Sequence, residues 1–212
     1  MKLAIVYAII AVVSAQVLLN ALCCRMSERG VDDKMKAKLL DLHNKFRQKV
    51  ANGQQPNQPS ASNMKEVHWD DEIATKAQQI VERCVFQHST YEERKTSKYP
   101  IVGENIYMGS YANPLDTAMN MWFDEVKDVN PSVLQRFNFN GPKVIGHYTQ
   151  LVWAETEAIG CGYMKKADDG QAYVFCQYAP GGNYQDQSVY KQGPPASACP
   201  SGKSSKYPGL CS

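Results

Sequence analysis

Apolar residues recur every three or four positions in three stretches of the chain, which is the spacing of an amphipathic helix. The first stretch, residues 32–51, has acidic residues at its start and basic residues near its end, as a helix dipole favours. The second covers residues 70–86. The third, residues 113–126, opens with an asparagine followed by a proline, which suits a helix start. We therefore expect three helices, with a Gly- and Pro-containing loop at 52–63 after the first.

Shorter apolar segments predict β-strands. "IVGENIYMG" (101–109) is short, contains β-branched residues and is bounded by glycine, which suits a strand or a tight turn. "AIGCGYMKK" (158–166) and "QAYVFCQYA" (171–179) flank the turn "ADDG" and alternate in part between apolar and polar residues, which is typical of a β-hairpin. Helices combined with a late hairpin predict an α+β fold, with helices packed in layers over a sheet. A chain of 212 residues suits one such domain.

The N-terminal segment, residues 1–23, begins with one lysine and continues without a charge, which predicts a secretory signal peptide. A membrane-spanning anchor is the alternative, although Gln16 and Asn20 interrupt the run and no basic cluster follows closely. Cleavage after Ala15 or after Cys23 fits the preference for small residues. We expect a secreted, extracellular protein with no stable membrane anchor once the signal is removed.

The cysteines agree with export. The chain has seven, with no CxxC pair and no spacing typical of zinc ligands, so they indicate disulfides in an oxidising compartment. Cleavage after Cys23 leaves none of them unpaired. Residues 191–212, rich in Pro, Gly and Ser, predict a tail that builds no core and is stapled locally by its own two cysteines. The six cysteines beyond residue 23 are Cys24, Cys84, Cys161, Cys176, Cys199 and Cys211.

The charged residues exclude one class of partner and leave a few candidates for chemistry. The net charge of +2 is spread without a basic stripe, which argues against nucleic acid. The histidines and two acids in apolar surroundings are the candidates, and spacing alone brings none of them together. His43 suits a structural role and His68 a surface position. The remaining candidates are His88 after the second helix, Glu104 in the first strand, Glu125 in the third helix and His147 in "GHYTQLVW".

Longer motifs add a family resemblance. "GHYTQLVWAET" (146–156) and "YVFCQYAPGGNY" (173–184) resemble the two signature motifs of the CAP superfamily, the cysteine-rich secretory, antigen 5 and pathogenesis-related 1 proteins. "LLDLHNKFR" (39–47) and "VGENIY" (102–107) resemble its first-helix and strand motifs. The chain is most similar to the antigen 5 type, the venom and salivary allergens of arthropods. The resemblance implies a three-layer α–β–α sandwich.

The same resemblance implies the domain limits and the disulfides. The CAP domain would cover residues 24–190, followed by the extension 191–212. Cys161 would pair with Cys176 across the hairpin, and Cys24 with Cys84 at the end of the second helix. Antigen 5 proteins carry a further cysteine shortly after the His-Ser motif, where this chain has Tyr91, so that bridge is missing.

A central cleft lined by His88, Glu104, Glu125 and His147 is also implied by the resemblance. His88 and His147 would be the ligands of a divalent ion such as Zn²⁺, each oriented by a carboxylate through its other ring nitrogen. A metal-dependent protease would also need an activated water or a nucleophile. The chain has no HExxH motif and no recognisable nucleophile motif, so we expect a protein that is not an enzyme.

Two non-catalytic functions follow from the resemblance. The first is a carrier of sterol or fatty acid, with the loop 131–145 as the lipid site and Phe137 and Phe139 as its aromatic anchors. The alternative for both phenylalanines is ordinary packing in the core, and Val144 stands where sterol binding would favour a third aromatic residue. The second function is that of an effector that binds a protein target, such as an ion channel or a host receptor.

Overall fold

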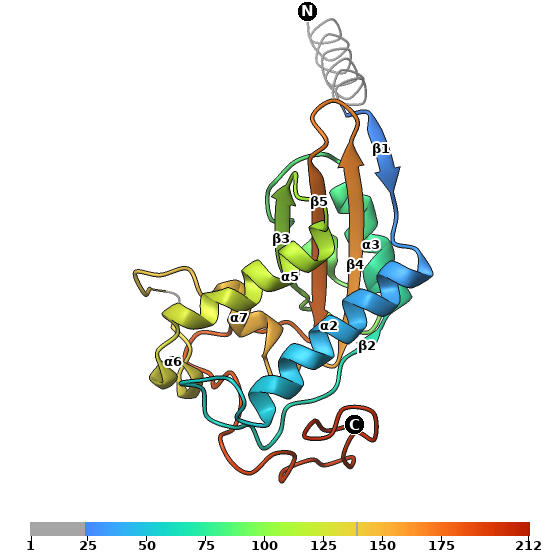
Figure 1. Cartoon of the computed structure of the whole chain (residues 1–212). Helices are drawn as coiled ribbons and strands as arrows, with labels where there is room; N and C mark the ends of the chain where they lie inside the picture. The colour runs from blue at the N-terminus through green and yellow to red at the C-terminus, as the bar shows by residue number, and fades with distance from the viewer. Residues whose placement is uncertain (1–23, 139) are drawn as a thin grey trace, which may run out of the picture.

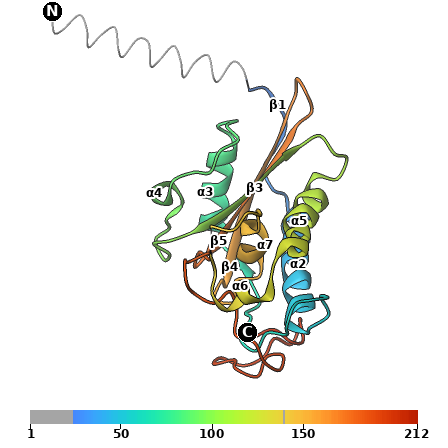
Figure 2. The same ribbon diagram turned by 90° about the vertical axis from the view of Figure 1, so that its left-hand side faces the viewer.

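The structure is a computed structural model that describes residues 24–138 and 140–212. The predicted signal peptide, residues 1–23, lies outside the described residues, as does Phe139. Helices cover both faces of a central sheet, which Figure 2 shows nearly edge-on. The expected α+β architecture, a three-layer α–β–α sandwich, is confirmed.

The central sheet has the strand order β1–β4–β5–β3, and neighbouring strands on this path run antiparallel (Figure 1). The hairpin expected from the sequence forms its middle, with the turn at residues 167–170. A short strand, β2, pairs in parallel with β4. The strands are β1 (Met26–Arg29), β2 (His68–Trp69), β3 (Gly103–Gly109), β4 (Ala158–Lys166) and β5 (Ala172–Ala179).

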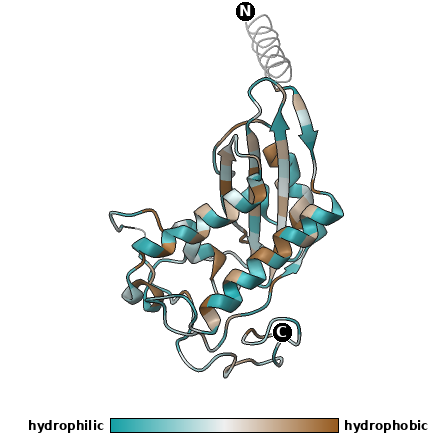
Figure 3. Cartoon of the chain, in the orientation of Figure 1, coloured by the Kyte–Doolittle hydropathy of each residue, from teal (hydrophilic) through white to brown (hydrophobic). Residues whose placement is uncertain are grey.

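Helices α2 and α5 cover one face of the sheet and α3 covers the other (Figures 1 and 2). Figure 3 shows bands of hydrophobic and hydrophilic residues along α2 and α5, as the spacing of three or four residues predicts. The expected third helix is divided into α5 and a turn of 3-10 helix, η1. The helices are α2 (Asp33–Ala51), α3 (Asp71–Val81), α4 (Tyr91–Arg94), α5 (Pro114–Asp124), η1 (Glu125–Asp128), α6 (Pro131–Gln135) and α7 (Gly146–Leu151).

Helix α3 is shorter than its apolar pattern predicts. The side chain of Asp70 caps its start by accepting a hydrogen bond from the backbone N–H of Ile73, at 2.9 Å. The helix ends at Val81 rather than at residue 86. Cys84 has a φ of 59°, in the left-handed region that a right-handed helix cannot continue through. The disulfide to Cys24 is made from this position.

Two glycines of β4 let α3 lie directly on the sheet. A Cβ atom on Gly162 would come within 2.6 Å of the backbone of Ala77, and one on Gly160 would collide with the backbone of Ala74. Cys161 lies between them on the other face and is bonded to Cys176, its partner in the β4–β5 register. The sequence "GCG" therefore brings a helix close on one face and fixes the hairpin on the other.

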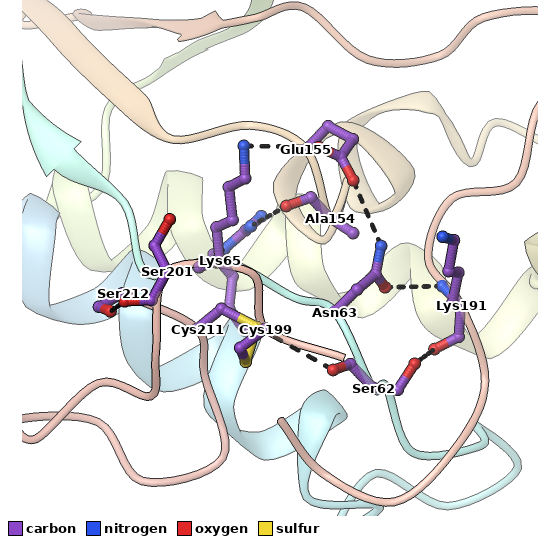
Figure 4. The surroundings of a disulfide bond; sticks show 11 residues. Ser62, Asn63, Lys65, Ala154, Glu155, Lys191, Cys199, Ser201, Cys211 and Ser212 are labelled. Atoms are coloured by element: carbon purple, nitrogen blue, oxygen red, sulfur yellow. Dashed lines mark hydrogen bonds and ion pairs between the residues drawn. A yellow bond between two sulfur atoms is a disulfide. The ribbon is translucent and has the colours of Figure 1, made fainter. Parts of the chain in front are cut away.

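The C-terminal tail contributes to the main core, which corrects the expectation that it builds none. Tyr207 and Leu210 are buried and belong to the same apolar cluster as α2 and the sheet. The bond between Cys199 and Cys211 holds the tail in the conformation that buries them (Figure 4). The composition of the tail gives the wrong expectation, because two apolar residues are enough to join the core although Pro, Gly and Ser surround them.

Hydrogen bonds attach the tail to the segment that follows α2. The backbone N–H of Lys191 donates to the side chain of Asn63 at 2.8 Å, and the hydroxyl of Ser62 donates to the carbonyl of Lys191 at 3.2 Å (Figure 4). The backbone N–H of Cys211 donates to Met64 O at 2.8 Å. The region after residue 190 is thus an integral part of the folded chain.

Arg47 of α2 joins this helix to two segments by hydrogen bonds, the one before β2 and the one between α7 and β4. Its side chain is 1% exposed, and its guanidinium donates to five backbone carbonyls at 2.8 to 3.3 Å. Burial lowers the pKa of Arg47 to about 9, since removal from water disfavours the charge. The acceptors are the carbonyls of Lys65, Leu151, Trp153, Ala154 and Thr156.

The first prediction concerns Arg47. Replacing it in Arg47→Lys keeps the charge but removes the planar fork of donors, so several buried carbonyls lose their partner. We expect the free energy of unfolding to fall by about 3 kcal/mol or more. The control is Arg136→Lys, at an exposed arginine paired with Asp186, for which a change within about 0.5 kcal/mol is expected. Equal denaturant midpoints for the two variants would contradict this role.

Candidate functional site

The carboxylate of Glu104 forms one half of the site. Glu104 is the second residue of β3, and its side chain is 1% exposed. The ring of His88, in the loop after α3, donates through Nδ1 to Oε1 at 3.1 Å. The backbone N–H and hydroxyl of Ser89 donate to the two carboxylate oxygens at 3.0 and 2.8 Å. Gln177 of β5 adds a donor at 3.1 Å. The buried acid is thereby fully hydrogen-bonded and orients His88.

The pKa of Glu104 is lowered below its ordinary value. Burial acts in the opposite direction and is the largest single influence, because it disfavours the charged form. Hydrogen bonds from His88 and Ser89 and the charge of Arg94, at 3.5 Å, outweigh it together. Glu104 is therefore a carboxylate that holds its neighbours in place.

The second half of the site is built around Glu125, at the junction of α5 and η1. Its Oε1 accepts a hydrogen bond from Nδ1 of His147 at 2.6 Å. Its Oε2 accepts from the backbone N–H groups of His147 and Tyr148, at 2.9 and 3.0 Å. The indole of Trp122 stacks on the imidazole, with ring centroids 6.2 Å apart and planes 13° from parallel. Position and ring orientation of His147 are both fixed.

A buried chain of hydrogen bonds supports His147 from behind. The side-chain amide of Asn105 donates to the carbonyl of His147 at 3.0 Å and to the hydroxyl of Tyr178 at 3.2 Å. Nε2 of His43 lies 2.9 Å from that hydroxyl, and its Nδ1 donates to the carbonyl of Leu39 at 2.7 Å. Burial lowers the pKa of His43 to about 4, and the charge of Arg47 acts in the same direction, so the ring is neutral near pH 7.

Both halves meet at one cleft of about 620 Å³. His88 and His147 line it, whereas Glu125 stands behind its histidine. Each imidazole uses Nδ1 for its carboxylate, and no described residue forms a hydrogen bond with Nε2 of either ring. The four residues expected as a tetrad thus form two carboxylate–histidine pairs around a common cavity. The other candidates lie elsewhere, His43 in the core and His68 on the surface.

The arrangement suits a divalent metal ion in the chemistry of its donors. An imidazole whose Nδ1 is held by a carboxylate presents Nε2 as a zinc ligand, and the pairs at His88 and His147 both have this form. A closed structural site would need more ligands. No group of three or more His, Cys, Asp or Glu side chains in residues 24–138 and 140–212 is arranged to hold a metal. Among the described residues the cleft offers two histidine ligands, which would leave the other coordination positions of the metal open.

The loop proposed as a lipid site is packed differently from the expectation. Phe137 is fully buried, and its ring meets that of Trp153 edge to face at 6.2 Å. In this conformation Phe137 follows the packing alternative, because its ring is covered by the protein itself. Phe139 lies outside the described residues, so its part in the expectation stays a prediction.

Several residues of the site escape sequence reasoning. Ser89, Arg94 and Gln177 surround Glu104, and Asn105 fixes the backbone of His147. The one available signal is adjacency, since Ser89 and Asn105 directly follow expected site residues. Their roles depend on contacts between segments far apart in the sequence.

No helix in the described part of the chain is both long enough and apolar enough to cross a membrane. The paired cysteines are those expected, Cys24 with Cys84, Cys161 with Cys176 and Cys199 with Cys211.

Comparison with known proteins places this geometry in a family. The model of the cysteine-rich secretory protein family, CAP, matches residues 40–178. Scoloptoxin SSD43 of the centipede Scolopendra dehaani is 58% identical over 207 residues, covering 98% of each chain. Venom allergen 5 of Vespula pensylvanica is 40% identical, with 76% of this chain and 82% of the allergen covered.

Solved structures agree. The crystal structure of NaASP2 with Zn²⁺ superposes with a TM-score of 0.73 at 34% identity, covering 89% of this chain and all of the other. The motifs, the layered fold and the cleft with its two carboxylate–histidine pairs therefore have one explanation. The chain belongs to the cysteine-rich secretory protein (CAP) family and is similar to the venom proteins of arthropods.

Proposed function

We propose that this protein is a secreted venom component that binds a fatty acid. Secretion is supported by its similarity to centipede and wasp venom proteins and by three disulfides, which persist in oxidising compartments. A binding role is favoured over catalysis, because the described cysteines are all in disulfides and the sequence has no recognisable nucleophile motif.

A groove between α2 and the start of α5 carries the proposal of a fatty-acid site. Its volume is about 250 Å³, and apolar groups of Met35, Leu115 and Tyr163 contribute to its lining. Two lysines of α2, Lys34 and Lys38, line it as well. An apolar surface with positive charge beside it suits a molecule with a hydrocarbon chain and a carboxylate.

The two lysines differ in their availability. Lys38 forms an ion pair with Asp116 across the groove, so its charge is partly offset. Lys34 is exposed and forms no ion pair with any residue that the structure describes. We therefore assign the carboxylate of the ligand to Lys34.

Size favours a fatty acid over a sterol. A volume of about 250 Å³ lies below the usual range of ligand pockets, which suits part of one extended chain better than a fused ring system. The loop 131–145 offers less to a ligand, because Phe137 is already packed against Trp153.

The second prediction tests the charge at this groove. Lys34→Glu should weaken binding of labelled palmitate to the mature protein at least fivefold, because an attraction becomes a repulsion. Lys203→Glu, the same charge change at an exposed lysine of the tail, should leave it within twofold. Equilibrium binding of tritiated palmitate measures both.

Ala112→Trp separates this groove from other lipid sites. Ala112 is exposed and lines the groove, so an indole there should block the chain. Ala167→Trp at the β4–β5 turn is the matched control. Wild-type binding in Ala112→Trp would move the site to another part of the molecule. Absence of palmitate binding in all forms would end the carrier proposal.

We propose in addition that the cleft binds a zinc ion through Nε2 of His88 and His147. The support is the donor arrangement and the structural relative NaASP2, which was crystallised with Zn²⁺. Glu104 and Glu125 orient the two rings and increase their basicity as ligands. Bound there, zinc would supply a Lewis-acidic centre with open positions.

The third prediction concerns this metal. His147→Ala removes one of two protein ligands and should reduce zinc affinity at least about tenfold. His68→Ala, at an exposed histidine of β2, should not change it. Titration calorimetry with zinc chloride is the measurement. Unchanged affinity in His147→Ala would place any zinc site outside the cleft.

A further inference from the structure

The mouth of the cleft is apolar on three sides. Tyr91, Ile101 and Val144 line it, and they are 62, 41 and 70% exposed. Tyr91 and Ile101 come from neighbouring segments, α4 and the residues before β3, whereas Val144 comes from the loop before α7. Large apolar side chains this exposed are costly in water, so their convergence on one cavity marks a contact surface.

Polar side-chain atoms of the cleft that the internal hydrogen bonds leave free are acceptors. Nδ1 of His88 and of His147 donates to a carboxylate, and these bonds select the Nδ1–H tautomer, in which Nε2 carries a lone pair. Asn105 is nearly buried and also lines the cleft. Its nitrogen must face the carbonyl of His147, which only accepts, and no described residue donates to its Oδ1. Three acceptors are thus presented to one cavity.

The charged residues around the cleft also favour a ligand that donates hydrogen bonds. Arg94 also lines the cleft, but its guanidinium donates to the carbonyls of Val102 and Ser89 and pairs with Glu104. Arg94 and Glu104 therefore offset each other. The carboxylate of Glu125, directly behind the ring of His147, has no cationic side chain paired with it among the described residues apart from that imidazole. Glu125 is therefore an acid beside the cleft that no described arginine or lysine offsets.

We propose that the cleft binds a basic side chain of a protein partner, an arginine above all. A guanidinium has five N–H donors and no acceptor, which complements a cleft that offers free acceptors with the carboxylate of Glu125 beside them. The aliphatic stem of that arginine would pack against Val144 and Ile101, and the ring of Tyr91 would lie beside the cation.

This site is separate from the groove that we assign to fatty acid. A carboxylate headgroup finds no free lysine in the cleft and meets acceptors and negative charge, so the two surfaces select opposite ligands. The proposal concerns a second binding activity and does not rest on the first. Zinc would occupy the same two Nε2 atoms, and a metal chelator is therefore present in the test.

The fourth prediction uses two blocked peptides of the same shape. Acetyl-Leu-Arg-Leu-amide should bind the mature protein at least tenfold more tightly than the same peptide with citrulline, which lacks the charge. Titration calorimetry gives the affinities. Methyl signals of Val144 and ring signals of His147 in NMR spectra should shift with the arginine peptide, which locates it in the cleft.

Two lysine substitutions test the location without disturbing the hydrogen bonds. Val144→Lys puts a positive charge at the mouth of the cleft and should weaken the arginine peptide at least tenfold. Met121→Lys makes the same change at an exposed position of α5 that does not line the cleft, and affinity should stay within twofold. Both positions are exposed, so both variants should fold.

Asn105→Ala provides the test of the third acceptor. It should weaken the arginine peptide severalfold while leaving palmitate binding unchanged, and its near-UV circular dichroism reports whether the variant folds. Equal affinity for the arginine and citrulline peptides overturns the proposal. Equal affinity of Val144→Lys and Met121→Lys for the arginine peptide also overturns the proposal, whether or not palmitate binds.

Discussion

The position of Arg47 inside the protein is the constraint on which the rest of the structure depends. Its guanidinium holds four carbonyls within residues 151–156, from the end of α7 toward β4, together with that of Lys65. A buried charge is tolerated only when its donors are satisfied, so these segments have one arrangement open to them. That arrangement places α7, and His147 at its second position, against the sheet.

Strand β3 then divides the site between the two faces of the sheet. Glu104 and Asn105 are consecutive, so their side chains point to opposite faces. Glu104 meets His88 and the α4 region, while Asn105 meets the backbone of His147. An edge strand thereby joins two halves that the sequence keeps about sixty residues apart. Each carboxylate fixes its imidazole, and the cleft presents acceptors rather than donors.

The sequence predicts the elements well and the site in part. The helical period of 32–51 and the turn in 167–170 are local signals, and both elements form where expected. The end of α3 was missed because Cys84 adopts a left-handed conformation that an apolar pattern does not reveal.

The site residues come together through contacts between segments that are distant in the sequence. Glu104 is noticeable as an acid in a strand, but its meeting with His88 depended on a family resemblance. Asn105 gave no signal, because its role arises from the contact of β3 with α7. The burial of Leu210 could not be predicted, because the composition of the tail indicates a loop. The disulfide of the tail holds Leu210 in the core.

The carboxylates of Glu104 and Glu125 hold both cleft histidines with Nδ1 protonated and Nε2 free. Nitrogen-15 chemical shifts of selectively labelled imidazoles measure this directly at pH 8 in the presence of a chelator. The structure predicts the Nδ1–H tautomer for His88 and His147. Dominance of the Nε2–H tautomer at either residue would contradict the account, since the cleft would then present a donor where we infer an acceptor.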